Sequence, residues 1–236
     1  MTSAVQSDPV TWRHTMGRCC CVMTILVVLI GLVALSGVAQ AFEKLTAAQN
    51  LVYDTAHLSN TLAGQQINYR YRSQMATDVI IEDRVSLSIK KTHEDDKRDL
   101  VVDFLSAERH MPFPDFNAFR GNPVIIAMLE HIAQGFGRET GGGVLYFRNR
   151  IRDALAKEST RIELVTIEFK DRTIEATRVL FSPFVGDAYL AERPEYTHAA
   201  FSITLSNEVP GGVVGIAVTS SHNGVTYFER EIVIEY

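Results

Sequence analysis

Cysteine is nearly absent from this chain of 236 residues and is confined to one place. The three cysteines, Cys19 to Cys21, are consecutive and precede a long apolar run. The sequence after that run has no thiol, which excludes a disulfide framework and a cysteine nucleophile there. A domain without disulfides depends on its hydrophobic core, and a domain of about 195 residues is large enough to bury one.

Basic residues are also few and scattered. The chain has 23 Lys and Arg against 28 Asp and Glu, which gives a formal net charge of -5, and it contains no run of basic residues. Binding to nucleic acid requires a surplus of positive charge on one face to neutralise phosphates. We therefore expect no nucleic-acid partner.

Motifs for catalysis and metal binding are missing as well. The sequence has no Gly-x-Ser-x-Gly and no glycine pattern of the phosphate-binding or dinucleotide-binding kind. His110 and His131 occur near Glu108 and Glu130, but not at the spacing of metal ligands. We expect no catalytic residue, metal or cofactor, and a hydrolase assembled from scattered residues is the least favoured hypothesis.

The apolar run has the features of an export signal. Two arginines precede nearly uninterrupted apolar sequence from Val22 to Val38, and Ala39-Gln40-Ala41 supplies a small-x-small cleavage pattern. Residues 1–41 are therefore predicted to be a Sec-type signal peptide. The alternative is an uncleaved membrane anchor, because the run approaches the roughly 18 to 20 residues that span a bilayer. Both predictions place residues 42–236 in the periplasm or outside the cell, as a single β-rich domain.

Short alternating segments dominate that domain. Ile67, Tyr69 and Tyr71 alternate with polar residues, a pattern typical of a strand with one buried face. About eight such strands are separated by turns, and one turn carries the hairpin signal Asn223-Gly224. No strand-helix-strand alternation is present, so we expect an antiparallel sheet in an α+β domain.

Three segments have helical patterns instead. Apolar residues recur at three- to four-residue spacing in each of them, and Asn122-Pro123 is a strong helix start. The expected helices span residues 43–59, 123–134 and 146–157. Gly135 and Gly137 are expected to end the second helix, and Gly141-Gly142-Gly143 is expected to be a flexible break before the third. The last two helices form a central insertion at about residues 112–157.

The order of these elements resembles the bacterial periplasmic lipoprotein-carrier family of LolA and LolB. Leu45 to Leu62 resembles the leading helix of that family, Ile67 to Arg72 its first strand, and the segment from Asn122 to Ile126 its lid helix. The resemblance implies a curved, half-barrel-like sheet with helices over its open face and an apolar cavity for acyl chains. The segment from Gly141 to Arg152 has no counterpart in that family.

Two sets of residues are candidates for binding. The candidate ligand-binding residues are large apolar side chains around the strands and the insertion: Tyr69, Tyr71, Phe104, Met128, Ile132 and Phe136. Arg148 and Arg152 share one helix face after the glycines and form a candidate anion-binding site. The alternatives are an ordinary packed core for the first set and a solvated or ion-paired helix face for the second.

These observations favour an exported, non-enzymatic binding or carrier protein for an apolar ligand such as a lipid or acyl chain. The alternative hypothesis is an envelope structural module that binds a protein partner and has a fully packed core. The sequence identifies neither the ligand nor the partner.

Overall fold

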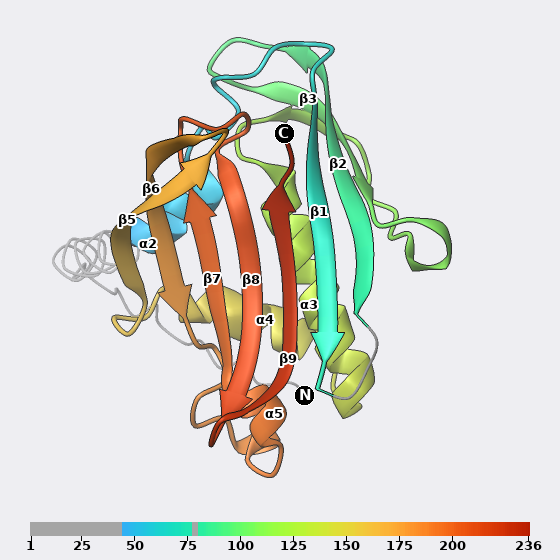
Figure 1. Ribbon diagram of the computed structural model, residues 1–236, viewed down its shortest axis with the longest axis vertical. Helices are drawn as coiled ribbons and strands as arrows, with labels where there is room; N and C mark the ends of the chain where they lie inside the picture. The colour runs from blue at the N-terminus through green and yellow to red at the C-terminus, as the bar shows by residue number, and fades with distance from the viewer. Residues whose placement is uncertain (1–43, 77–79) are drawn as a thin grey trace, which may run out of the picture. The chain divides into compact units, whose positions relative to one another are not determined.

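The computed structural model describes residues 44–76 and 80–236 (Figure 1). Leu45–Tyr236 form one compact unit. The predicted signal peptide or anchor at residues 1–41 lies outside the described residues. No helix in the described part of the chain is long and apolar enough to cross a membrane.

A nine-stranded antiparallel sheet is the frame of the domain. Its strands lie in the order β4-β3-β2-β1-β9-β8-β7-β6-β5, and the sheet curves around α3 and α4 on one face (Figure 1). The strands are β1 Gln66–Met75, β2 Ile81–Thr92, β3 Arg98–Phe104, β4 Phe116–Phe119, β5 Arg161–Phe169, β6 Arg172–Phe181, β7 Ala199–Leu205, β8 Val213–His222 and β9 Val225–Ile234. The expected α+β fold with a curved antiparallel sheet is confirmed.

The strand count exceeds the expected eight by one, and β4 is a strand without a clear sequence signal. It has four residues and follows a proline-rich loop. Its pairing with β3 is limited to Arg98↔Phe119 and Leu100↔Phe116, with a register shift between them. Such a short, irregular edge strand is too brief for its alternation to be recognised.

The hairpin of β5 and β6 extends beyond the rest of the sheet. The last pair between β6 and β7 is Thr177↔Leu205, and the remainder of β6 pairs with β5 alone. At the end of this hairpin the Phe169 ring lies 5.0 Å from the ring of Tyr236, measured between centroids. The hairpin end therefore packs near the C-terminal end of β9.

Helix α3, Pro123–Thr140, begins as the sequence predicts. The Asn122 side chain accepts a hydrogen bond from the Val124 amide at 3.0 Å, and Pro123 occupies the first turn. Asn122 also donates to the Tyr69 hydroxyl at 3.1 Å, so the cap fixes the start of the helix to β1.

The expected end of α3 near residue 135 is wrong, because the glycines inside it serve close packing. A Cβ at Gly135 would lie 2.8 Å from Nη1 of Arg230, and one at Gly137 would lie 3.2 Å from Cγ2 of Val144. The helix continues to Thr140 and ends at Gly141, whose φ of 75° suits a left-handed C-cap. Helix α4, Val144–Ala154, then starts two residues before the expected position.

The N-terminal segment is less regular than the expected helix over residues 43–59. It consists of a short α2, Ala47–Gln49, followed by a π-helical turn η1, Asn50–Asp54. The Thr46 hydroxyl donates to the Leu155 carbonyl at 3.0 Å, which holds the start of the segment to the end of α4.

His57 holds the other end of the N-terminal segment. Its Nε2 lies 2.8 Å from the Leu51 carbonyl, and its Nδ1 accepts a hydrogen bond from the Asn122 amide at 3.2 Å. Burial lowers the pKa of His57, so the ring is neutral and can accept at one nitrogen while donating at the other. The remaining short helical elements are η2 Ala107–Arg109, η3 Ala188–Leu190 and α5 Pro194–Thr197.

Candidate functional site

The six apolar residues expected to bind a ligand lie together between α3 and the sheet. Tyr69, Tyr71, Phe104, Met128, Ile132 and Phe136 are each at most 4% exposed. The Phe136 ring packs edge-on against the rings of Phe147, Tyr196 and Phe228, with centroids 5.1 to 5.9 Å apart. The inner face of the sheet is filled by these side chains, and their role in ligand binding stays a prediction.

An ion pair between a buried arginine and a more exposed glutamate interrupts this packed layer near the end of α3. Arg230 of β9 is 5% exposed, and its Nη2 donates to Oε1 of Glu139 at 2.6 Å. The guanidinium also lies over the Phe136 and Phe228 rings, 5.7 and 5.1 Å from their centroids. A buried charge of this kind needs its partner, because an unpaired charge inside a protein is costly.

His131 lies on α3 beside this ion pair. Burial, together with the positive charges of Arg230 and Arg138, lowers its pKa to about 4. The neutral ring is hydrogen-bonded through Nε2 to the Tyr71 hydroxyl, with the two atoms 3.1 Å apart. His131 therefore joins α3 to β1. No group of three or more His, Cys, Asp or Glu side chains in the described ranges is placed to hold a metal ion.

The other side of α3 is open. It borders a groove of about 570 Å³, which we call the helix groove, between the N-terminal segment, α3 and α4. The residues that line the helix groove are Leu45, Gln49, Tyr53, Phe113, Ile126, Leu129, Glu130, Arg148, Ile151 and Arg152. Ile126 is 38% exposed and Leu45 is 41% exposed, so apolar surface in the groove is left in contact with solvent.

The two predicted anion-binding residues both lie at the rim of the helix groove. Arg148 makes two hydrogen bonds to Glu130, each 2.8 Å long, and this contact lowers the pKa of the Glu130 carboxyl. Arg152 pairs with its neighbour Asp153 at 3.1 Å, and both side chains are more than half exposed. The charge of Arg148 is therefore already balanced, whereas Arg152 is free to exchange an exposed partner for an anion.

Tyr53 adds a polar group to the same rim. Burial raises the pKa of its hydroxyl to about 12, although the positive charge of Arg152 acts in the opposite direction. The hydroxyl is therefore protonated and neutral near pH 7, and it is available as a hydrogen-bond donor close to Arg152. A neutral donor beside a guanidinium suits an anionic head group above an apolar floor.

Most residues of the helix groove were not identified from the sequence. Ile126 carried the strongest signal, because Val124, Ile125 and Ile126 are three consecutive apolar residues at the start of α3. Three consecutive residues point in three directions around a helix, so one of them had to lie outside the stripe that faces the sheet. That signal indicates a second apolar face but not what covers it.

The chain resembles known proteins at the level of structure and not of sequence. No protein-family profile and no curated protein sequence matches it. Several solved structures are weakly similar in architecture, among them the three described below. Lipoprotein LppX from Mycobacterium tuberculosis has a TM-score of 0.34 at 8% identity, and the match covers 80% of this chain and 93% of LppX.

Two further structures have lower TM-scores. The MucA/MucB complex of Pseudomonas aeruginosa has a TM-score of 0.31 at 10% identity, with 80% of this chain and 57% of that chain covered. A LolA superfamily protein from Nitrosomonas europaea has a TM-score of 0.24 at 8% identity, with 81% and 92% covered. The expected resemblance to the lipoprotein carriers is present as a weak likeness of architecture, and the site has to be interpreted from its own residues.

Proposed function

We propose that this protein is an exported, non-enzymatic binding or carrier protein for lipid, and that the helix groove holds one acyl chain of an anionic lipid. The observation that carries the proposal is the combination of an uncovered apolar floor and the lightly paired Arg152 at its rim. A volume of about 570 Å³ lies within the range of roughly 300 to 1,000 Å³ that is usual for small-molecule sites.

The apolar floor supports an acyl chain as the occupant. Ile126 and Leu45 are partly exposed, and a chain lying on them would remove both from water. Each buried methylene group contributes about 0.8 kcal/mol, so affinity can be built from the chain alone. Arg152 and the Tyr53 hydroxyl would then select a lipid whose head group is anionic.

One residue that lines the helix groove is close in sequence to the apolar run, which also supports a lipid as the ligand. Leu45 lines the groove, and the apolar run that ends at Val38 precedes it closely. Seven residues span at most about 25 Å when fully extended. If the run is kept as a membrane anchor, the groove is therefore held within reach of the bilayer surface.

The second candidate is a partner-binding module, and the filled interface between α3 and the sheet favours it. Binding of palmitate to the purified chain separates the two. Ile126→Asp should abolish binding, because it places a carboxylate in the apolar floor. Arg152→Gln should weaken binding about tenfold through loss of a charge-assisted hydrogen bond, while Arg152→Lys retains part of it.

The matched control is Leu62→Asp, because Leu62 is 75% exposed and does not line the helix groove. It should bind palmitate as the unmodified protein does. Equal binding by Ile126→Asp and the unmodified protein would exclude the helix groove as the lipid site. No palmitate binding by the unmodified protein would favour the partner-binding module.

A further inference from the structure

The β5–β6 hairpin separates its charged side chains by face. β5 pairs with β6 at all nine of its positions without a register shift, and side chains alternate between the two faces along each strand. One face carries no basic residue, and we call it the acidic face; its members include Leu164, Thr166 and Glu168 of β5 and Glu175 and Thr177 of β6. The arginines of the hairpin, Arg161, Arg172 and Arg178, lie on the opposite face. Thr177 pairs with the buried Leu205 of β7, so the acidic face continues the inner face of the sheet.

A pocket of about 390 Å³, which we call the hairpin pocket, lies on the acidic face. It is bounded by the β5–β6 hairpin, the N-terminal segment and the turn between β7 and β8, and it shares no lining residue with the helix groove. Leu51 and Ala56 contribute apolar surface from the N-terminal segment. Leu164 contributes apolar surface from β5 and is 87% exposed, more than any other large apolar side chain in the described part of the chain. The hairpin pocket has a volume usual for small-molecule sites, and an occupant would remove Leu164 from water.

Among the described residues, the hairpin pocket is lined by one acidic residue, Glu175, and by no lysine or arginine. The backbone of Glu175 is fixed, because its amide donates to Oε1 of Glu208 at 3.2 Å and its carbonyl accepts from the Ser206 hydroxyl at 2.6 Å. Its carboxylate forms no ion pair within residues 44–76 and 80–236, and Arg172 pairs with Glu208 instead, at 3.8 Å. His57 also lines the pocket, but burial lowers its pKa, so its ring is neutral. The pocket therefore carries one negative charge that the described part of the chain leaves without a counter-ion.

The polar groups around Glu175 can accept hydrogen bonds. Thr177 lines the pocket two residues further along β6 and on the same face, so its hydroxyl lies beside the Glu175 carboxylate. Ser59 and Asn207 add two more side-chain oxygens to the lining. The wall contributed by the N-terminal segment includes Leu51 of the π-helical turn η1, and such turns are frequent at functional sites. The hairpin pocket thus combines acceptors around one negative charge with apolar surface.

We propose that the hairpin pocket binds a small organic cation, a primary amine attached to an apolar body. The ammonium group lies against the Glu175 carboxylate and the Thr177 hydroxyl, and the apolar body covers Leu164. An ammonium group has three N–H donors and no acceptor, so it matches a site that offers acceptors and a negative charge. The inference concerns a second site and does not depend on lipid binding in the helix groove.

Three probes with the same aromatic body and different charge test the proposal. The full chain is titrated with phenethylamine, 2-phenylethanol and 3-phenylpropanoate, and binding is followed by the NMR chemical shifts of its backbone amides. Phenethylamine should cause saturable shifts at Leu164 and Thr177. The neutral alcohol should bind about threefold to fivefold more weakly, because it lacks the ion pair with a solvent-exposed carboxylate, and the anion should bind more weakly still. No saturable shift with phenethylamine, or equal affinity for the three compounds, would overturn the proposal.

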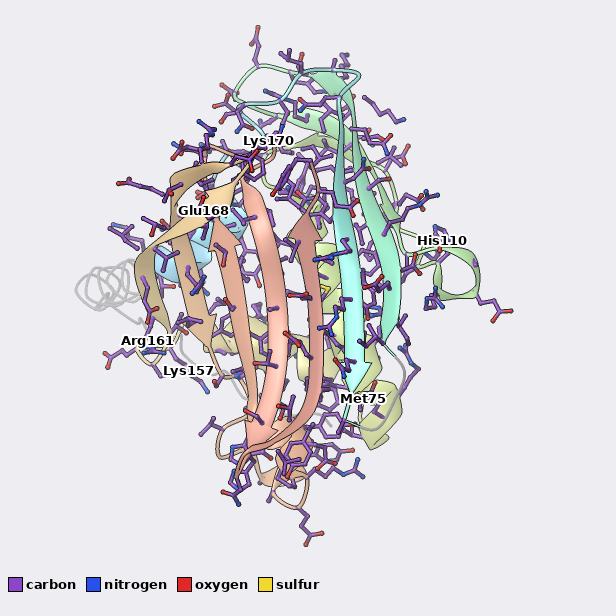
Figure 2. The ribbon with its side chains drawn as sticks, viewed as in Figure 1. Met75, His110, Lys157, Arg161, Glu168 and Lys170 are labelled. Atoms are coloured by element: carbon purple, nitrogen blue, oxygen red, sulfur yellow. The ribbon has the colours of Figure 1, made fainter. Side chains whose placement is uncertain are left out.

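Substitution of the carboxylate locates the charge that selects the amine. Glu175→Gln should weaken phenethylamine binding about threefold to fivefold and leave 2-phenylethanol binding unchanged. The matched control is Glu168→Gln, because Glu168 lies on the acidic face but does not line the hairpin pocket. Glu168 is near the turn that carries Lys170, at the other end of β5 from Arg161 (Figure 2).

Both Glu168→Gln and Ile126→Asp, the variant of the helix groove, should bind phenethylamine as the unmodified protein does. An equal loss of affinity in Glu175→Gln and Glu168→Gln would assign the preference to the general charge of the hairpin and overturn the proposal. Loss of phenethylamine binding in Ile126→Asp would place the amine in the helix groove and overturn it as well.

Discussion

Helix α3 has two apolar faces with different surroundings. The face toward the sheet carries Met128, Ile132 and Phe136, which are fully buried among aromatic side chains. The face toward α4 carries Ile126, which remains partly exposed in the helix groove. Residues of the same chemical type thus serve as core on one side and as accessible surface on the other. Apolar character alone does not distinguish a binding residue from a core residue, and the difference lies in whether another element covers it.

The largest expected effect is on the buried face. Met128→Ala should lower the free energy of unfolding by about 2 to 5 kcal/mol, because it leaves a cavity between α3 and the sheet. Denaturant unfolding measures this loss of stability. Without denaturant, where the variant is still folded, it should bind palmitate as the unmodified protein does. Little loss of stability together with altered lipid retention would show instead that α3 is a lid over a second site.

Acid should weaken the same face through His131. Its pKa is about 4 in the folded protein, against 6.5 for an ordinary histidine, so the unfolded chain binds the proton more readily between these values. The contribution of neutral His131 to the free energy of unfolding is fully present above about pH 6.5. It falls by up to about 3 kcal/mol as the pH drops toward 4. His57, whose pKa is also lowered, contributes in the same direction.

Denaturant midpoints at pH 7 and pH 4.5 test this dependence. His131→Asn keeps a hydrogen-bonding group but cannot take up the proton, so its midpoint should change less between the two pH values than that of the unmodified protein. An unchanged pH dependence in His131→Asn would assign the acid sensitivity to His57 or to other groups.

Gly142 and Gly143, which lie between α3 and α4, differ in how much space they leave for a side chain. A Cβ at Gly142 would lie 2.8 Å from Cε2 of Phe147, whereas a Cβ at Gly143 would meet no atom within 4 Å. Gly142→Ala should therefore destabilise the protein by about 1 to 3 kcal/mol through overpacking. Gly143→Ala should change stability by less than about 0.5 kcal/mol. Equal losses of thermal stability in the two variants would mean that the backbone between α3 and α4 shifts to accommodate the new Cβ at position 142 without disturbing Phe147.

The smallest effect on stability is expected on the open face. Ile126→Ala should cost less than about 1 kcal/mol, because the side chain is already partly in water. Its affinity for palmitate should nevertheless fall, since the floor of the helix groove loses apolar area. A loss of stability as large as that of Met128→Ala would show that the two faces of α3 are equally part of the core.

Local sequence signals were sufficient to predict most strands of the sheet and the start of α3. The alternation of Tyr69 and Tyr71 with polar residues identified β1, and Asn223-Gly224 forms a turn in which both residues have positive φ, 51° and 78°. Asn122-Pro123 fixed the first turn of α3 because the cap needs only neighbouring residues. These features depend on interactions within a few residues.

Features that depend on distant residues could not be predicted. Gly135 did not end α3, because its role is to leave space for Arg230, which follows it by almost a hundred residues. The pairing of Arg148 with Glu130 joins two helices and leaves Arg152 as the more available cation, a difference that their shared helix face does not reveal. The helix groove likewise forms only when three separate segments come together.

The central pairing of the sheet has a consequence for how the chain folds. β1 and β9 are neighbours, with Tyr69 opposite Ile234, so strands from the two ends of the domain meet in the middle of the sheet. Contacts between residues so distant in sequence slow folding, because the entropy cost of closing a long loop comes before the pairing contributes any stability. The sheet therefore cannot be completed until β9, the last strand of the domain, has been synthesised and joins the strands before it to β1.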